Sequence, residues 1–166
     1  MRYTFMLADE TELEEVYALI NQRIEWMDEV GIQQWNVTKY WEAYPKSYFI
    51  NQVQQGNLYV LKQMDTKKVI GAVVCLTTDK RWKNSSSVSA YYLHNFVTDK
   101  NEPGVGKLIL KYVEDLAIKN HKTHIRLDCA IHNTRLNAYY EEKGYILKGQ
   151  CEDGLYKGNN REKLLF

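Results

Sequence analysis

The sequence predicts a single domain over residues 1–166 of the mixed α/β class, with one helix crossing over between two parallel strands. Three observations lead to this fold class. A chain of 166 residues fits one domain and can bury a core without metals or disulfides. Its apolar residues alternate with period two in some stretches and recur at helical spacing in others. A strong helical pattern over residues 108–119 separates two strand patterns, which is typical of a crossover.

The N-terminal third is expected to form one strand and two helices. Asp9 is suited to a helix N-cap, and Glu12 three residues later completes a capping box. Apolar residues then recur at helical spacing as far as Gly31, which favours a helix end there. The expected elements are a strand at 2–7, a helix after Asp9, an irregular or weakly helical link at 32–45, and a second helix from Pro45 to Gly56.

The rest of the chain is expected to form a sheet with two further helices. Residues 64–67 separate two β-rich runs and signal a hairpin. The expected elements are strands at 58–63 and 68–77, a polar loop at 79–87, a strand at 88–98, a helix at 108–119, a strand at 125–130, a helix at 133–143 ending at Gly144, and strands at 145–151 and 162–166. Hairpin-linked strands thus precede a β-α-β unit, which predicts a mixed sheet.

Charge and composition exclude several classes of protein. Acidic and basic side chains nearly cancel, with a formal net charge of +1, so we expect no nucleic-acid partner and no membrane partner. The N-terminus lacks the apolar core of a signal peptide, and no apolar run is long enough to span a membrane. Cys75, Cys129 and Cys151 are too few for a disulfide framework, which favours a cytoplasmic location.

Two short spacings have partial metal-ligand character. Cys129 lies three residues before His132, and His121 lies three residues before His124. Neither pair supplies the three or four protein ligands of a zinc site, so no metal is predicted. Cys129 is expected to be a buried apolar residue, because a reactive thiol needs an electropositive, partly exposed setting.

A short glycine turn precedes the crossover helix. Gly104 and Gly106 permit positive φ angles and close approach of a ligand to the backbone. The start of the next helix offers unpaired N–H groups and the positive end of the helix dipole, which together suit a phosphate. Lys107 adds a positive charge.

Other phosphate-binding loops do not fit this turn. A Walker A loop needs Gly at the position of Asn101 and Ser or Thr at the position of Leu108. A Rossmann fingerprint needs a third Gly at the position of Ile109. Two readings stay open on this motif alone: a phosphate cradle, and a tight turn that binds nothing.

Two motifs together resemble the GNAT superfamily of N-acetyltransferases. In the first, Gly104 and Gly106 are followed by the apolar pair Ile109-Leu110. The second has the family's spacing at Asn133, Leu136, Tyr140, Gly144 and Tyr145. The similarity covers residues 57–151, and Asn101 departs from the Gln or Arg usual at its position. It implies a GNAT-like, mostly antiparallel twisted sheet flanked by helices, with a splayed parallel strand pair at its centre.

The resemblance implies an acetyl-CoA-dependent N-acetyltransferase of a single acyl-CoA domain, with acetyl-CoA as co-substrate. The thioester would enter between the strand ending at Thr98 and the strand at 125–130. Tyr140 would act as general acid toward the leaving thiolate, with Tyr139 packing instead. The cofactor-binding residues implied are Phe96, Val97, Thr98, Gly104, Val105, Gly106, Lys107, Asn133 and Tyr140. Asn133 would in any case serve as a helix cap.

The sequence gives weaker signals for the residues that bind the acceptor than for those that bind the cofactor. His94 is the candidate general base, because it lies on the strand bordering the implied site and titrates near neutral pH. Asp128 is its rival, and a structural hydrogen bond would equally explain either residue. The aromatic stretch beginning at Gly31 looks like one found in bacterial GNAT proteins of unassigned substrate. The residues expected to bind the acceptor are Trp35, Tyr44, Asn95 and Asp128.

The expected acceptor is a primary amine of a small molecule or peptide, attacked directly in a ternary complex. Self-association into a homodimer is common in the family and stays open. The alternative is a non-catalytic sensor that binds coenzyme A or a nucleotide through the same turn. A third reading is an interaction module in which the glycine turn is only a turn.

Overall fold

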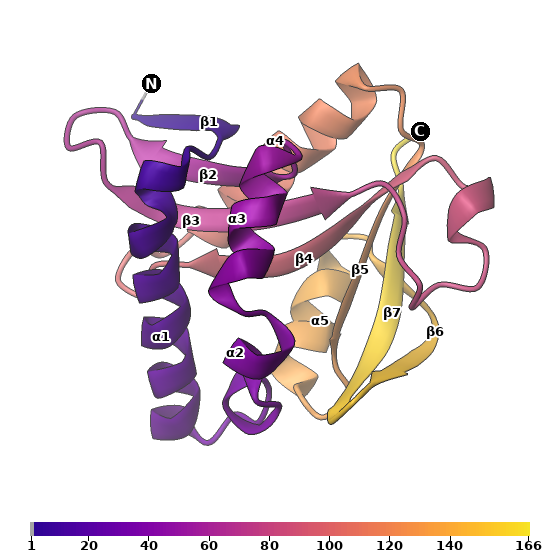
Figure 1. Ribbon diagram of the computed structural model, residues 1–166. Helices are drawn as coiled ribbons and strands as arrows, with labels where there is room; N and C mark the ends of the chain where they lie inside the picture. Colours follow the sequence, from indigo (N-terminus) through magenta and orange to yellow (C-terminus); the bar gives the residue numbers. More distant parts are fainter. Residues whose placement is uncertain (1) are drawn as a thin grey trace.

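The computed structural model describes residues 2–166 and contains one seven-stranded mixed sheet (Figure 1). Its strand order is β1-β2-β3-β4-β5-β7-β6. The strands are β1 Tyr3–Leu7, β2 Leu58–Gln63, β3 Val69–Leu76, β4 Ala90–Thr98, β5 His124–Ala130, β6 Ile146–Asp153 and β7 Tyr156–Leu164. Every neighbouring pair is antiparallel except β4 and β5, so the sheet has the mixed class that the sequence predicts.

Helices cover both faces of the sheet (Figure 1). They are α1 Leu13–Val30, α2 Tyr40–Ala43, α3 Lys46–Gln54, α4 Val105–Lys119 and α5 Thr134–Glu142. One buried cluster joins α1, α2 and α3 to the sheet through residues such as Ile20, Phe49 and Val60. A second joins α4 and α5 to the opposite face, around Ile109 and Leu127. This division follows from the period-two alternation of side chains along each strand. None of the described helices has the length and apolar character needed to cross a membrane.

The parallel pair at the centre of the sheet splays apart. β4 pairs with β5 only from Ala90 to Tyr92, whereas β4 continues to Thr98 along β3. Asn95 has φ 52°, and the register between β3 and β4 shifts at this point, so the strand carries a β-bulge there. The edge of β4 that faces β5 is therefore without a strand partner beyond Tyr92 among residues 2–166. This is the splayed pair implied by the resemblance.

Helix ends follow the predicted signals. Asp9 and Glu12 form the expected capping box, and it opens a 3₁₀ turn, Glu10–Glu12, that leads into α1. Gly31 ends α1 with φ 76°. Asn133 caps α5 by accepting a bond from the Leu136 N–H, as expected. α4 begins at Val105, directly after Gly104, so it is one turn longer than the predicted helix at 108–119.

The C-terminal hairpin differs from the prediction. Strands were expected at 145–151 and 162–166, but β6 and β7 extend toward each other and are joined by a two-residue turn at Gly154 and Leu155. β7 is rich in polar residues, and its buried Asn160, Arg161 and Glu162 are satisfied mainly by polar partners. Because strand prediction relies on apolar residues, this stretch gave too weak a signal.

Candidate functional site

A cavity of about 530 Å³ opens beside the splayed strands. Its walls come from the link between α1 and α3, from β4 and β5, from the loop after β3, from α5 and from the β6–β7 hairpin. This volume lies within the usual range for small-molecule sites, about 300–1,000 Å³. The walls bring together residues far apart in the sequence, which is typical of a ligand site at a break in a sheet.

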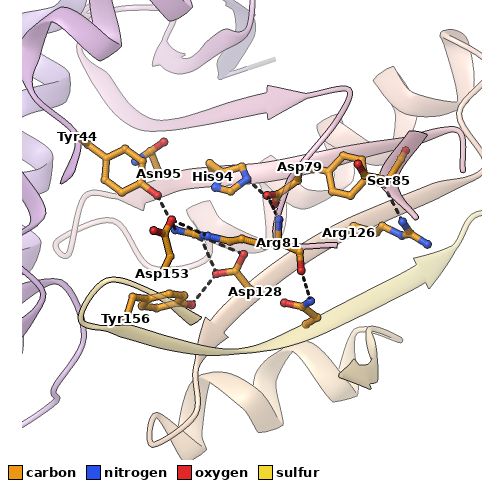
Figure 2. Close-up of polar contacts among 12 residues, drawn as sticks. Tyr44, Asp79, Arg81, Ser85, His94, Asn95, Arg126, Asp128, Asp153 and Tyr156 are labelled. Atoms are coloured by element: carbon orange, nitrogen blue, oxygen red, sulfur yellow. Dashed lines mark hydrogen bonds and ion pairs between the residues drawn. The ribbon is translucent and has the colours of Figure 1, made fainter. Parts of the chain in front are cut away.

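Arg81 occupies the centre of the polar cluster in this cavity (Figure 2). Its guanidinium donates to Asp128 at 3.3 Å, to Asp153 at 3.0 Å and to the Tyr44 hydroxyl at 3.0 Å. Tyr156 also donates to Asp128 at 2.6 Å and places its ring 5.1 Å below Arg81. Burial alone would lower the pKa of Arg81, but Asp128, Tyr44 and Asp153 raise it above its ordinary value. Arg81 is thus a permanent cation that holds β5 and the hairpin together.

The loop that carries Arg81 is itself anchored. Asn160 of β7 donates to the Arg81 carbonyl at 3.0 Å. The ring of Trp82 lies 4.3 Å from the guanidinium carbon of Arg126, which in turn pairs with Glu162 at 2.7 Å. These contacts fix a loop that the sequence predicts only as polar.

His94 of β4 forms a pair with Asp79 at the end of the same cavity (Figure 2). The distance from His94 Nε2 to Asp79 Oδ2 is 2.9 Å. Burial alone would raise the pKa of Asp79, but the bond from His94 and the Arg81 N–H lower it below its ordinary value. An ionised Asp79 can only accept, so His94 Nε2 donates this hydrogen bond, and Nδ1 has no hydrogen-bond partner among residues 2–166.

Asn95 sits at the bulge of β4 and ties the helical link to the sheet. Its amide nitrogen donates to the Tyr40 hydroxyl at 2.8 Å, and its oxygen accepts from Tyr48 at 2.8 Å. Both bonds lie within the cavity wall. The side chain predicted to touch the acceptor is therefore engaged in shaping the wall, and its left-handed backbone fits the tolerance of Asn for that conformation.

Tyr140 and Tyr139 of α5 point to different surroundings. Tyr140 is buried and lines the cavity, and no hydrogen bond joins its hydroxyl to any of residues 2–166. Burial raises the pKa of Tyr140 well above its ordinary value. The Tyr139 hydroxyl instead approaches Gly106, where an added Cβ would lie 3.8 Å from it. The neighbouring positions therefore face the cavity and the glycine turn respectively.

The glycine turn opens α4 without a cap. Gly104 has φ 85°, no side chain caps the helix, and its first turn contains no acidic residue. Within residues 2–166 nothing accepts a bond from the amides of Gly104, Val105, Gly106 or Lys107. Four such donors at the positive end of a helix dipole favour an anion. The turn lies outside the cavity walls, next to the end of β4, where Thr98 is 3.9 Å from an added Gly106 Cβ.

Buried Asp99 fixes the approach to this turn. It accepts from the Asn101 N–H at 2.9 Å, from Lys68 at 2.9 Å and from Gln22 at 3.3 Å. Burial alone would raise the pKa of Asp99, but the Asn101 N–H and Lys68 lower it below its ordinary value. Arg23 of α1 fastens the adjacent strand end by donating to the Thr98 carbonyl at 2.8 Å and hydroxyl at 3.0 Å.

The predicted site residues fall into two groups. Those that line the cavity are Trp35, Tyr44, His94, Asn95, Phe96, Asp128 and Tyr140. Those that lie outside it are Val97, Thr98, Gly104, Val105, Gly106, Lys107 and Asn133. Val97 is buried in the core beneath α1, and Asn133 donates to Gln34 at 3.0 Å, which joins α5 to the helical link.

Several polar residues of the cavity were not predicted as site residues, among them Asp79, Arg81, Asp153 and Tyr156. One signal was available, because Asp153-Gly154 is a dipeptide typical of hairpin turns. A hairpin placed there would have set Tyr156 on a strand beside the site. The position of Arg81 follows from tertiary contacts and has no local signal.

The cavity also contains a compact set of metal-ligand types. Ligand atoms of Asp79, His94 and Asp128 all lie within 4.8 Å of one another. Asp128 is already paired with Arg81, and Asp79 with His94, so these contacts compete with an ion. The spacings noted around Cys129 do not contribute. Burial raises the pKa of Cys129 to about 12, which agrees with the inert buried thiol that was predicted.

Residues 20–145 match the model of the Acetyltransferase (GNAT) family. No curated protein matches the sequence. Among solved structures, a GNAT-family acetyltransferase from Listeria monocytogenes is 21% identical, with a TM-score of 0.80, and the match covers 98% of this chain and 94% of that one.

Two further structures have similar folds. The PaiA N-acetyltransferase from Thermoplasma acidophilum, solved in complex with coenzyme A, is 17% identical, with a TM-score of 0.75 and 99% of each chain covered. A mutant of the spermidine N-acetyltransferase SpeG from Vibrio cholerae is 14% identical, with a TM-score of 0.66, and covers 99% of this chain and 94% of its own. At these identities the likeness concerns the fold, which agrees with the predicted one.

Proposed function

This chain belongs to the Acetyltransferase (GNAT) family, and from that premise we propose that it transfers an acetyl group from acetyl-CoA to a primary amine. The observation that carries the proposal is the gap between β4 and β5, with a polar cavity on one side and the uncapped start of α4 on the other. One arrangement thus offers separate places for an anionic cofactor and for an acceptor.

The cofactor side is supported by the amides of the glycine turn. Gly104, Val105, Gly106 and Lys107 would hold the pyrophosphate, with the Lys107 ammonium nearby. The unpaired edge of β4 beyond Tyr92 would pair with the pantetheine arm. A coenzyme A complex of PaiA, which shares the fold, supports this assignment. When bound, acetyl-CoA supplies an activated thioester carbonyl.

The oxyanion donor would be a main-chain N–H next to the bulge. The bulge at Asn95 rotates the backbone of Phe96 out of the regular ladder with β3. An N–H freed in this way can polarise a carbonyl oxygen in the gap, and one such donor is typically worth about 2.7–4 kcal/mol of barrier. Phe96 lines the cavity and its neighbour Val97 is buried, so we assign the donor to Phe96.

Proton removal from the acceptor would fall to His94. A primary alkylamine has a pKa of about 10.4 and is therefore mostly protonated at neutral pH. Only its neutral form can attack the thioester carbonyl. Asp79 fixes the His94 tautomer and stabilises the imidazolium that forms. Asp128 is the weaker candidate, because Arg81 and Tyr156 already bond its oxygens.

Proton delivery to the leaving thiolate would come from Tyr140. The C–S bond of the thioester breaks as the C–N bond forms, and the hydroxyl proton goes to sulfur. Because burial keeps Tyr140 protonated and its hydroxyl bonds to none of the described residues, the proton is free for this step. General acid help is typically worth about 10²–10⁴-fold in rate.

The test is release of free thiol from acetyl-CoA with a panel of amines: aliphatic diamines, amino acids, aminoglycosides and peptides. Amine-dependent release above hydrolysis is expected for at least one class. A non-catalytic sensor would instead show a thermal shift with acetyl-CoA and no turnover with any amine. No thermal shift at millimolar acetyl-CoA would exclude both functions.

A further inference from the structure

The cation at the centre of the acceptor cavity, Arg81, is already paired with two carboxylates. A guanidinium has five N–H donors, and those of Arg81 are directed to Asp128, Asp153 and Tyr44. Tyr156 covers one face of the group. The charge of Arg81 is therefore already engaged by two carboxylates, which weakens its attraction for the carboxylate of a ligand.

The carboxylates around Arg81 keep unused acceptor capacity. Arg81 bonds Asp153 through Oδ2 alone, so Oδ1 is unbonded within the described part of the chain, and the side chain is 40% exposed. Asp128 accepts two bonds at Oδ1 and one long bond of 3.4 Å at Oδ2. One guanidinium neutralises only one of these two carboxylates. The cluster thus has an excess negative charge that faces the cavity.

An aromatic wall borders this charge, and its Tyr44 hydroxyl is bonded to Arg81. Rings of Trp35, Tyr40, Tyr44 and Tyr48 follow one another at centroid distances of 4.8, 5.2 and 5.0 Å. All four line the cavity. Aromatic faces attract cations and cover methylene chains, whereas they offer nothing to a carboxylate.

The formal charge of the cavity walls is negative. Asp79, Asp128 and Asp153 oppose Arg81 and Lys80, with His94 paired to Asp79. Lys80 is exposed and makes no ion pair with any of residues 2–166. It is therefore the one lysine or arginine of the described cavity wall without an ion-pair partner, and the opposing hypothesis is that it binds an acidic acceptor.

We propose that the acceptor is an aliphatic amine with a second cationic group and with no carboxylate beside the reacting amine. The second ammonium would bind Asp153 and Asp128, while the methylene chain lies along the aromatic wall. This inference rests on the proposed function and narrows it to a substrate class. It excludes free amino acids as preferred acceptors.

Three matched acceptors test it: cadaverine, L-lysine and pentylamine. L-lysine is cadaverine with one carboxylate added, and pentylamine is cadaverine with one ammonium removed. With acetyl-CoA in excess, we expect kcat/KM for cadaverine to exceed that for each of the others by at least about tenfold. Because each comparison changes a single charged group, general reactivity of the amine cancels.

Substitution of Asp153 tests whether this residue causes the preference for cadaverine. Asp153→Asn should lower the cadaverine-to-pentylamine ratio of kcat/KM by about fivefold or more, because only cadaverine has the ammonium that the lost charge attracts. If the substitution only made Arg81 less well ordered, kcat/KM would fall equally for cadaverine and for pentylamine, and their ratio would stay unchanged. Glu152→Gln removes the same charge from an exposed neighbour outside the cavity walls, and it should keep the ratio.

Calorimetry measures binding of the three amines to the chain saturated with coenzyme A. Together with the turnover rates, it distinguishes failure of the proposed substrate class from failure of the proposed acetyl transfer. Selective binding of cadaverine without turnover would support the substrate class and count against acetyl transfer. Turnover with equal rates for cadaverine and pentylamine would overturn the substrate class and leave acetyl transfer standing. Preference for L-lysine that disappears in Lys80→Gln would overturn it in favour of an acidic acceptor.

Discussion

Tyr140 shows how burial suits a side chain to the general-acid role proposed for it. The residue is buried and lines the cavity, and burial raises its pKa well above the ordinary value, so the hydroxyl keeps its proton at neutral pH. A group in this state donates a proton and does not act as a base. The spacing from Asn133 predicted the position, but its surroundings depend on β5 and Tyr145, which only the fold brings near.

The first prediction concerns this hydroxyl. Tyr140→Phe should lower kcat by about 10²–10⁴-fold, because the leaving thiolate loses its proton donor. Thermal shift should show that acetyl-CoA still binds. Tyr139→Phe removes the neighbouring hydroxyl and should have a much smaller effect on kcat, as it faces the glycine turn. Equal losses in both variants would count against the role of Tyr140.

The second prediction concerns the Asp79–His94 pair. Asp79→Asn and His94→Gln should each lower kcat/KM, and the double variant should be little worse than His94→Gln alone, because the two side chains act as one unit. Steady-state kinetics of the four proteins give the coupling directly. Independent, multiplicative losses would show that Asp79 does not act through His94.

Some residues of the site could be predicted from the sequence and others could not. His94, Asp128 and Tyr140 were predicted as site residues and do line one cavity. Asp79 and Arg81 were not, because a polar loop carries no periodic signal and their partners are distant in sequence. The position of Asp79 depends on His94 of β4, and that of Arg81 on β5, on β7 and on Tyr44 just after α2.

Among the helices, α4 is the one whose first turn is proposed to bind the cofactor phosphate. Gly104 has φ 85°, and an added Cβ would meet nothing within 4 Å in the protein. A third prediction follows: Gly104→Ala should cost about 1–2 kcal/mol through backbone strain alone. It should also weaken acetyl-CoA binding, because the amides of the turn move.

Gly149→Ala is the matched control for this variant. It also meets nothing within 4 Å, but its φ lies outside the left-handed range, so stability and binding should stay unchanged. Urea unfolding and calorimetric titration with acetyl-CoA measure both effects. Unaltered acetyl-CoA affinity in Gly104→Ala would argue against the turn as the phosphate site.

The turn between β4 and α4 depends on the charge of Asp99. In the folded chain the pKa of Asp99 is lowered, so its stabilising contribution is present at neutral pH and is lost as pH falls through the folded value. A fourth prediction is that Asp99→Asn lowers the free energy of unfolding at pH 7 by about 1.5–3 kcal/mol. Below the usual Asp range of about 3.9 the difference from wild type should shrink. A constant difference down to low pH would contradict this account.

Element boundaries were predicted well where capping chemistry is local. Asp9, Gly31 and Asn133 end or begin helices as expected. β7 was largely missed, since its buried positions hold Asn160, Arg161 and Glu162 in place of apolar residues. Polar residues can occupy this strand because Glu162 accepts from Arg126, Arg161 donates to Asn137, and Asn160 donates to the Arg81 carbonyl.

On the scale of the whole chain, one break in a sheet organises the molecule. The break separates β4 from β5 beyond Tyr92, the cavity opens beside it, and the start of α4 lies near the end of β4. The mixed sheet and the crossover helix follow from the sequence pattern. The register that opens the gap at Asn95 does not, because a bulge of two residues leaves no mark in hydrophobic periodicity.

The most direct test of acetyl transfer is mass spectrometry of the amine after incubation with isotope-labelled acetyl-CoA and cadaverine. The account predicts that the label appears on the amine nitrogen in step with released coenzyme A, and that Tyr140→Phe abolishes most of it. Labelled free acetate without labelled amine, or label in the amine that is equal in wild type and Tyr140→Phe, would contradict the account.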